Sequence, residues 1–249
     1  YAFYQCGGID KISIPKIINV NEYTFYECKS LILDIEWNKL ESIGTYAFYY
    51  CSKVVSNSVE KVNLDKVINL EKGAFAYCRN LKKISISNIT ALEDTVFYGC
   101  SALIDITFPN ALESIGNSVF ASCTSLESII IPDSVTSLGN YAFHSCKILK
   151  DIEMKNVTSF GDYTFSSCDM LESITVPDSV TSIGNYAFHS CDILKEIEIK
   201  NITSLADYVF SSCPELVKVN FPNVTTIGTG TFSACEKLET ILIPNLNNI

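Results

Sequence analysis

One short motif, phenylalanine followed three residues later by cysteine, recurs along the whole chain. All 11 cysteines stand in it, and successive cysteines are 22, 23, 27, 22, 23, 23, 22, 23, 22 and 22 residues apart. A fixed period of this size is typical of a solenoid, in which a repeat cannot fold alone and packs against its neighbours. The 249 residues are therefore predicted to form one rod of 11 repeats.

A clean repeat shows what each unit contributes. Residues 168–191 read CDMLESITVPDSVTSIGNYAFHSC. The LESITV segment alternates at its end and predicts a short strand with one buried face, which the following proline ends. Apolar residues at every third position, then glycine and Ala-Phe, predict a tight turn or 3₁₀-like return arm. Parallel strands stacked about 4.8 Å apart would give a rod about 50 Å long.

The recurring text L-x-x-I-x-[IV]-P-x-x-V-x-x-I-G-x-x-A-F-x-x-C resembles the BspA-like leucine-rich repeat, also called the treponemal type, over nearly the whole chain. The resemblance implies a right-handed curved rod with one short parallel β-strand per 22–23-residue repeat. It also implies a surface or secreted protein of bacteria or mucosal protists that adheres to host matrix and other cells. Family members share no catalytic residues that could be carried over to this sequence.

Three features depart from the regular pattern. The 27-residue interval after Cys51 predicts an insertion near 54–58. After Cys28 the apolar set Leu33, Ile35 and Trp37 is shifted by one residue, which predicts a local irregularity. Residues 132–169 and 177–214 are nearly identical two-repeat blocks, offset by 45 residues. Residues 1–249 are expected to be a single domain, and a fragment of a longer chain, because neither end supplies a distinct capping repeat.

Charge and residue spacing exclude several functions. The net charge of -10 argues against nucleic-acid binding and against docking on anionic lipid. No apolar run approaches the roughly 18 residues of a membrane helix, so membrane insertion within this segment is not expected. No C-x-x-C pair occurs, and the two histidines are not at ligand spacing from a cysteine cluster. We expect no metal and no cofactor, and we expect the cysteines to be buried structural thiols in single file.

No catalytic residue is predicted. His144 and His189 both stand in Phe-His-Ser-Cys, but that position varies between repeats and no third orienting group is evident. Acidic pairs such as Asp151 with Glu153 would point to one side of a strand. They leave a hydrolase only as a remote alternative to a non-enzymatic protein.

The outward positions of the strands form the first candidate binding surface. Its N-terminal third is basic and its middle is acidic, so it would select partners by charge. The charged residues of this strand face are Lys11, Lys61, Lys83, Asp105, Asp151, Glu153, Glu196, Glu198 and Lys218.

Tyrosines of the N-terminal half form the second candidate surface. They stand just after the phenylalanine of the motif or beside that position, and tyrosine is enriched in protein interfaces. This row could bind a partner or mediate self-association. Its members are Tyr4, Tyr26, Tyr49, Tyr50, Tyr77 and Tyr98.

Four N-x-T sequons fall shortly after the predicted strands and would be candidate glycosylation sites in a secreted eukaryotic protein. Their asparagines are Asn88, Asn156, Asn201 and Asn223.

The features together predict a non-enzymatic adhesion or interaction module that binds a protein or glycan partner at the cell surface or after secretion. The alternative is an intracellular scaffold, cytoplasmic or cytoskeletal, within a larger assembly. A free cysteine in every repeat suits a reducing compartment.

Overall fold

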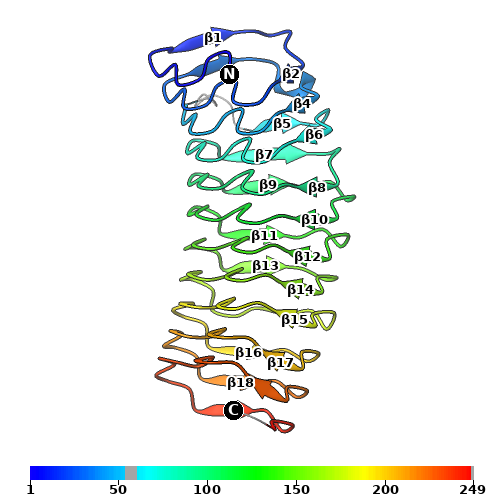
Figure 1. Cartoon of the computed structure of the whole chain (residues 1–249), viewed down its shortest axis with the longest axis vertical. Helices are drawn as coiled ribbons and strands as arrows, with labels where there is room; N and C mark the ends of the chain where they lie inside the picture. Colours follow the sequence, from blue (N-terminus) through cyan, green and yellow to red (C-terminus); the bar gives the residue numbers. More distant parts are fainter. Residues whose placement is uncertain (54–60, 248–249) are drawn as a thin grey trace.

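The computed structural model describes residues 1–53 and 61–247. These residues form a solenoid in which successive turns lie one on another along a single axis (Figure 1). The repeat solenoid expected from the period is therefore confirmed. The insertion expected near 54–58 lies outside the described residues.

A ladder of parallel strands of three or four residues runs along one side of the solenoid, and we call it the strand-face ladder. These strands form where the sequence alternates. In β11, β13 and β16 the central residue is buried and its two neighbours are exposed, whereas in β5 the two outer residues are buried. The strands are β1 (Lys11–Ser13), β3 (Ile32–Asp34), β5 (Val62–Leu64), β7 (Lys83–Ile86), β9 (Asp105–Thr107), β11 (Ser128–Ile130), β13 (Asp151–Glu153), β16 (Glu196–Glu198), β18 (Lys218–Asn220) and β20 (Thr240–Leu242).

The return arm of each repeat holds a second, two-residue strand that the sequence pattern did not predict. These strands pair in parallel and form what we call the return-arm ladder. They are β2 (Asn19–Val20), β4 (Ser42–Ile43), β6 (Asn69–Leu70), β8 (Ala91–Leu92), β10 (Ser114–Ile115), β12 (Ser137–Leu138), β14 (Ser159–Phe160), β15 (Ser182–Ile183), β17 (Ser204–Leu205) and β19 (Thr226–Ile227).

The Phe-x-x-Cys segment closes each turn and bonds to the same segment of the next turn. In the second repeat, the backbone N–H groups of Tyr23, Phe25 and Glu27 donate to carbonyls one turn further on, at 2.9, 2.9 and 2.7 Å. Tyr23 and Glu27 adopt positive φ of 50° and 56°, with Phe25 between them. In this conformation every second N–H points toward the next repeat. The backbone N–H groups of the segment therefore find hydrogen-bond acceptors although the segment is not a strand.

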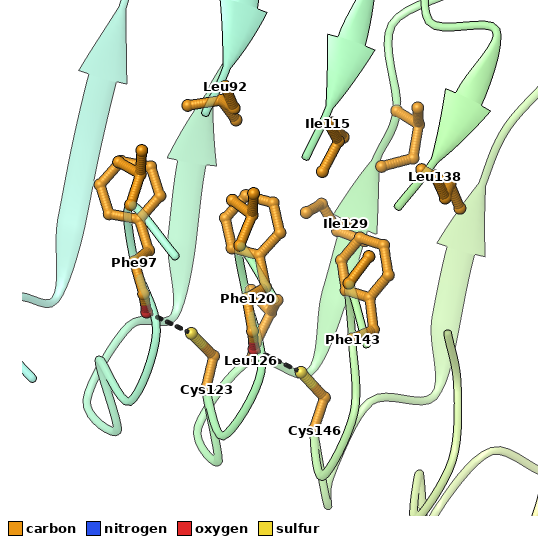
Figure 2. Close-up of a cluster of buried hydrophobic side chains, with 14 of the residues drawn as sticks. Leu92, Phe97, Ile115, Phe120, Cys123, Leu126, Ile129, Leu138, Phe143 and Cys146 are labelled. Atoms are coloured by element: carbon orange, nitrogen blue, oxygen red, sulfur yellow. Dashed lines mark hydrogen bonds between the residues drawn. The ribbon is translucent and has the colours of Figure 1, made fainter. Parts of the chain in front are cut away.

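The core is one continuous column of apolar side chains. Consecutive motif phenylalanines stack with ring centroids 5.3–6.0 Å apart, within the range of favourable aromatic pairs. Figure 2 shows Phe97, Phe120 and Phe143 in this column, with Ile115, Leu138 and other aliphatic side chains beside them. Each turn therefore buries its phenylalanine against the turns on either side.

The irregularity expected after Cys28 is confirmed, but the shift does not turn the apolar side chains outward. Strand β3 pairs with β1 one residue earlier than the pattern predicts, so Leu33 lies opposite Ile12 and stays buried. The chain then forms the 3₁₀ helix η1 (Trp37–Lys39), whose Trp37 is 7% exposed and contacts Phe48 and Phe75. The early pairing lengthens the segment between β3 and Phe48, and the short helix accommodates that extra length.

Candidate functional site

The strand-face ladder brings the charged strand residues onto one side of the molecule. Lys83 lies opposite Asp105, and Glu196 lies opposite Lys218, whose Nζ is 3.9 Å from the Glu196 carboxylate. Lys83 is half-buried, while the other predicted members of this surface are exposed. The basic start and acidic middle therefore lie on a common face.

Many charges around this face are paired between neighbouring turns. Lys150 contacts Glu127 at 2.9 Å and Lys195 contacts Glu172 at 2.6 Å. The second ion pair raises the pKa of Lys195 and lowers the pKa of Glu172. Because these side chains are exposed, solvent screens such pairs and they add little stability.

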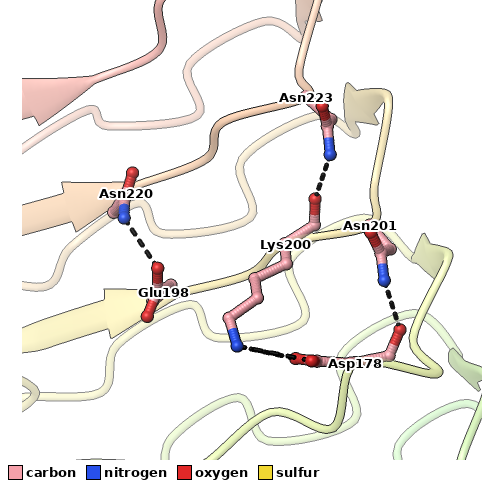
Figure 3. Close-up of polar contacts among 6 residues, drawn as sticks. All are labelled: Asp178, Glu198, Lys200, Asn201, Asn220 and Asn223. Carbon is pink, nitrogen blue, oxygen red and sulfur yellow. Dashed lines mark hydrogen bonds and ion pairs between the residues drawn. The ribbon is translucent and has the colours of Figure 1, made fainter.

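The acidic middle also contains hydrogen bonds between turns (Figure 3). Asn220 Nδ2 donates to Glu198 at 2.7 Å, and Lys200 Nζ lies 3.1 Å from the Asp178 carboxylate. Part of the charge that the sequence assigns to partner binding is therefore used inside the protein.

The cysteines form a thiol ladder. From Cys28 onward, each Sγ donates to the carbonyl oxygen of the motif phenylalanine in the preceding repeat, as Cys123 does to Phe97 and Cys146 to Phe120 (Figure 2). All 11 are free, and all except Cys6 and Cys235 are buried. Burial raises the pKa of Cys100 and Cys146 to about 12, so these thiols are protonated at neutral pH.

Of the two histidines, His189 bridges turns of the solenoid, whereas His144 makes its side-chain hydrogen bond to the adjacent Ser145. One ring nitrogen of His189 makes a hydrogen bond of 2.7 Å with Ser211 Oγ, and the other lies 3.1 Å from Ser190 Oγ. Its ring packs edge-on against Tyr186. Burial lowers the pKa of His144, which packs in the same way against Tyr141. Across residues 1–53 and 61–247, no three His, Cys, Asp or Glu side chains are grouped to hold a metal ion.

The six predicted tyrosines form one continuous chain of ring contacts, which we call the tyrosine strip. Tyr4, Tyr26 and Tyr49 stack in parallel with centroids 4.9 and 4.6 Å apart. Tyr77 then meets Tyr49 and Tyr98 edge-on at 5.5 and 5.0 Å, and it also contacts Tyr50 at 5.3 Å. The sequence placed these residues on one row, and the structure brings them into direct contact.

Cations lie over two rings of the tyrosine strip, those of Tyr50 and Tyr77. Lys29 Nζ is 4.8 Å from the centroid of the Tyr50 ring. The guanidinium of Arg79 is 5.0 Å from Tyr50 and 5.8 Å from Tyr77, within cation–π range. The strip is only partly covered: Tyr4 is 41% exposed and the other five rings are half-buried.

The structure also contains a second row of tyrosines that was not predicted from the sequence. Its residues stand two positions before the motif phenylalanine, and that offset is the signal that could have revealed them. The C-terminal part of this row is a parallel stack with centroids 4.6–4.8 Å apart, made of Tyr141, Tyr163, Tyr186 and Tyr208.

All four sequon asparagines make the same hydrogen bond. Each side-chain amide donates to a backbone carbonyl of the preceding repeat: Asn156 to Asp133 at 2.7 Å, Asn201 to Asp178 at 2.6 Å and Asn223 to Lys200 at 2.8 Å, with Asn88 donating to Asp65. Figure 3 shows the bonds of Asn201 and Asn223. Asn245 repeats the bond at 2.7 Å without a sequon. The asparagine therefore has a structural role, and glycosylation of these sites stays a prediction.

In the described part of the chain, no helix has the length and apolar character needed to cross a membrane. The only helix there is the three-residue η1.

Comparison with known proteins gives matches along the whole chain. The family model described as "BspA type Leucine rich repeat region" matches in six copies, over residues 1–88, 32–150 and 145–249. No curated protein matches the chain.

Three solved structures are similar. A leucine rich cell surface protein from Faecalibacterium prausnitzii A2-165 is 26% identical, with a TM-score of 0.57 over 94% of this chain and 79% of that chain. A leucine-rich repeat protein from Bacteroides ovatus ATCC 8483 is 23% identical, with a TM-score of 0.59 over 100% and 86%. The T. pallidum Leucine Rich Repeat protein is 27% identical, with a TM-score of 0.51 over 72% and 78%.

Proposed function

Because the chain belongs to the BspA-type leucine-rich repeat family, we propose that it is a protein-interaction module whose tyrosine strip binds a protein partner. Proteins with these repeats typically bind other proteins and are generally not enzymes. The observation that carries the proposal is the unbroken series of partly exposed ring contacts from Tyr4 to Tyr98.

The geometry of the strip favours a protein over a glycan. A sugar ring needs an open aromatic face, whereas the faces of Tyr26 and Tyr49 are stacked on neighbouring tyrosines. The strip instead offers ring edges, hydroxyl groups and the nearby cations Lys29 and Arg79. Tyrosine and arginine are the residue types that dominate binding energy in protein interfaces. A partner with apolar side chains and carboxylates would match this combination.

We place the protein at the cell surface or outside the cell. The support is the similarity to the F. prausnitzii protein, which is described as a cell surface protein. Adhesion is the corresponding role. An intracellular scaffold is the competing placement, and the thiol ladder is compatible with it because a reducing compartment would keep the thiols free.

The test is a binding assay with purified domain on a panel of immobilised extracellular-matrix proteins and on intact host cells. The triple variant Tyr26→Ser, Tyr49→Ser, Tyr98→Ser is expected to weaken binding at least about tenfold, as loss of interface hot spots does. The matched control replaces Tyr163, Tyr186 and Tyr208 of the second row by serine and should bind normally. Equal loss in both variants, with both folded by circular dichroism, would refute the strip as the binding surface.

The strand face is a second candidate surface. Asp151, Glu153, Glu196 and Glu198 are all exposed on it, in two turns separated by the turn that holds Ser173. Binding through this acidic region would recruit a basic partner and would weaken steeply with ionic strength. Binding through the tyrosine strip would depend less on salt, so one titration with sodium chloride separates the two surfaces.

A further inference from the structure

A column of glycines marks the closest approach between turns. These glycines stand four residues before the motif phenylalanine and include Gly139, Gly161, Gly184 and Gly228. A Cβ atom added at Gly139 would lie 2.6 Å from the carbonyl carbon of Gly116, and one at Gly184 would lie 2.5 Å from the backbone nitrogen of Asp162. Backbone atoms cannot yield at such distances, so a side chain here must separate the two turns.

Four repeats have another residue at this position: Asn21, Glu71, Glu93 and Ala206. The return-arm ladder is interrupted between β6 and β8 and between β15 and β17, at the junctions where Glu93 and Ala206 enter. At Glu71 the ladder continues, and there the carboxylate accepts hydrogen bonds from the N–H and Oγ1 of Thr45 at 2.8 and 2.7 Å. At Glu93 the carboxylate likewise accepts a hydrogen bond from the N–H of Lys72 in the preceding turn, at 2.8 Å. Of the two interrupted junctions in the described chain, only the one at Ala206 therefore lacks a side chain at this position that links the turns.

Backbone hydrogen bonds change in the same places. At glycine junctions the glycine N–H donates to the preceding turn, as Gly161 does to Leu138 at 2.9 Å and Gly228 to Leu205 at 2.8 Å. Within the described residues, the N–H of Ala206 makes no backbone hydrogen bond to Ile183. Thr203 likewise makes none to Thr181, although Thr225 donates to Thr203 at 2.9 Å one turn later.

The strand-face ladder also fails at the Ala206 junction. Residues 174–176 form no strand there, and the only pairing is the single bridge between Ser173 and Glu196. The strand face is hollowed on both sides of this strandless turn. A hollow of about 470 Å³ is lined by Thr175, Asp178, Glu198 and Lys200 among others, and one of about 440 Å³ lies on the side of β13. Over residues 1–53 and 61–247, this is the one junction between adjacent turns at which neither ladder continues as paired strands.

The Phe-x-x-Cys segment alone remains fully bonded at this junction. The N–H groups of Tyr186, Phe188 and Ser190 donate to carbonyls of the next turn at 3.0, 2.9 and 3.0 Å. On the other two sides no paired strands of the described chain cross the junction, and the turns are linked there by single contacts. These include the bond from the Asp207 N–H to Asn185 Oδ1 at 3.0 Å and the bond from Asn201 Nδ2 to the Asp178 carbonyl at 2.6 Å. We propose that this junction is a hinge, at which the C-terminal turns from Glu196 onward tilt about the Phe-x-x-Cys side, and that the methyl group of Ala206 creates it.

The duplicated block provides a natural comparison. Gly161 of the first copy corresponds to Ala206 of the second, 45 residues later. In the first copy β14 pairs with both β12 and β15, so the return-arm ladder is unbroken. The glycine-to-alanine difference thus accompanies the change from a closed to an open junction within almost the same sequence.

Hydrogen–deuterium exchange of the full chain tests the hinge. In the unsubstituted protein, the amides of Thr203 and Ala206 should exchange at least about tenfold faster than those of Thr158 and Gly161, because the latter pair is bonded across the junction. The substitution Ala206→Gly should slow exchange of the amides at 203 and 206 by about the same factor, since the turns can then approach. Amides of the Phe-x-x-Cys segment should keep their protection in both proteins, which also shows that the variant is folded.

The reciprocal variant Gly161→Ala should open the first copy and speed exchange at positions 158 and 161. Equal exchange rates at the two copies in the unsubstituted protein would overturn the hinge. So would an Ala206→Gly protein whose amides at 203 and 206 exchange as fast as before. If Gly161→Ala alone has no effect while Ala206→Gly slows exchange, the methyl group at 206 is still assigned as the cause of this hinge. If neither substitution changes the exchange rates, the methyl group of Ala206 is not the cause of the hinge.

Discussion

At the scale of single residues, hydrogen bonding explains why cysteine recurs in every repeat. The carbonyl of Phe97 accepts a bond from the N–H of Cys100 within its own turn and from Sγ of Cys123 in the next turn. A thiol is small and apolar enough for a buried column and still carries a weak donor. One residue type thus fills space and links two turns.

The sequon asparagines give a prediction at the same scale. Replacing Asn156 by Asp removes the Nδ2 donor and sets a carboxylate against the backbone carbonyl of Asp133. The substitution should lower the free energy of unfolding by about 1 kcal/mol, the usual value of one hydrogen bond. Urea unfolding followed by circular dichroism measures the change.

The matched variant is Asn245→Asp, which loses the equivalent bond at a position without a sequon. Both substitutions should destabilise the protein. If neither moves the urea midpoint, the amide ladder contributes nothing, and the asparagines would then be explained better as glycosylation sites.

At the scale of the structural elements, the stacked phenylalanines hold the turns together. Phe120 is fully buried, and its ring lies 5.8 Å from Phe97 and 5.4 Å from Phe143. Truncation to alanine should cost about 3–5 kcal/mol, as buried aromatic residues generally do. Phe120→Leu retains much of the apolar volume and should cost clearly less in the same urea experiment. Equal losses for leucine and alanine would contradict a role for packing at this position.

The elements also show what the sequence could and could not reveal. Residues that alternate or recur at a fixed offset, such as Ile152 in β13 and Phe120 in its arm, were predictable because burial imposes the period. The two-residue strands were not, since Ser159–Phe160 carries no alternation. The side-chain hydrogen bonds of Asn156 and Cys123 were also not predictable. Their acceptors lie one turn away, and residue spacing does not show which donor faces which acceptor.

The candidate surfaces divide in the same way. The tyrosine strip could be assembled from the period alone, because equivalent residues of successive turns lie side by side. The sequence could not predict that Glu198 accepts a hydrogen bond from Asn220 or that Asp178 pairs with Lys200. Whether an exposed polar side chain faces solvent or contacts the adjacent turn depends on local geometry. The one-residue shift before β3 was visible, while its absorption by η1 required the register of the actual strands.

At the scale of the whole molecule, the thiol ladder makes stability depend on alkaline pH. Burial raises the pKa of Cys100 and Cys146 to about 12 and that of Cys235 to about 11, against an ordinary value of 9.0, and it raises the pKa of Cys78, Cys123 and Cys168 as well. At a pH between the ordinary thiol pKa and the raised values, the unfolded chain releases thiol protons that the folded chain retains. The folded state therefore binds more protons, and its stability must fall as the pH rises.

The stabilisation from protonated buried thiols is thus complete below about pH 9 and is lost between about pH 9 and 12. Urea midpoints measured under a reducing agent should be flat from pH 7 to 8.5 and should then decline steeply, because many thiols titrate together on unfolding. In the Cys146→Ala variant the urea midpoint should decline less steeply with pH, because one buried thiol fewer titrates on unfolding. A midpoint that stays level up to pH 10.5 would mean that the cysteines ionise equally in both states, which is incompatible with a buried ladder.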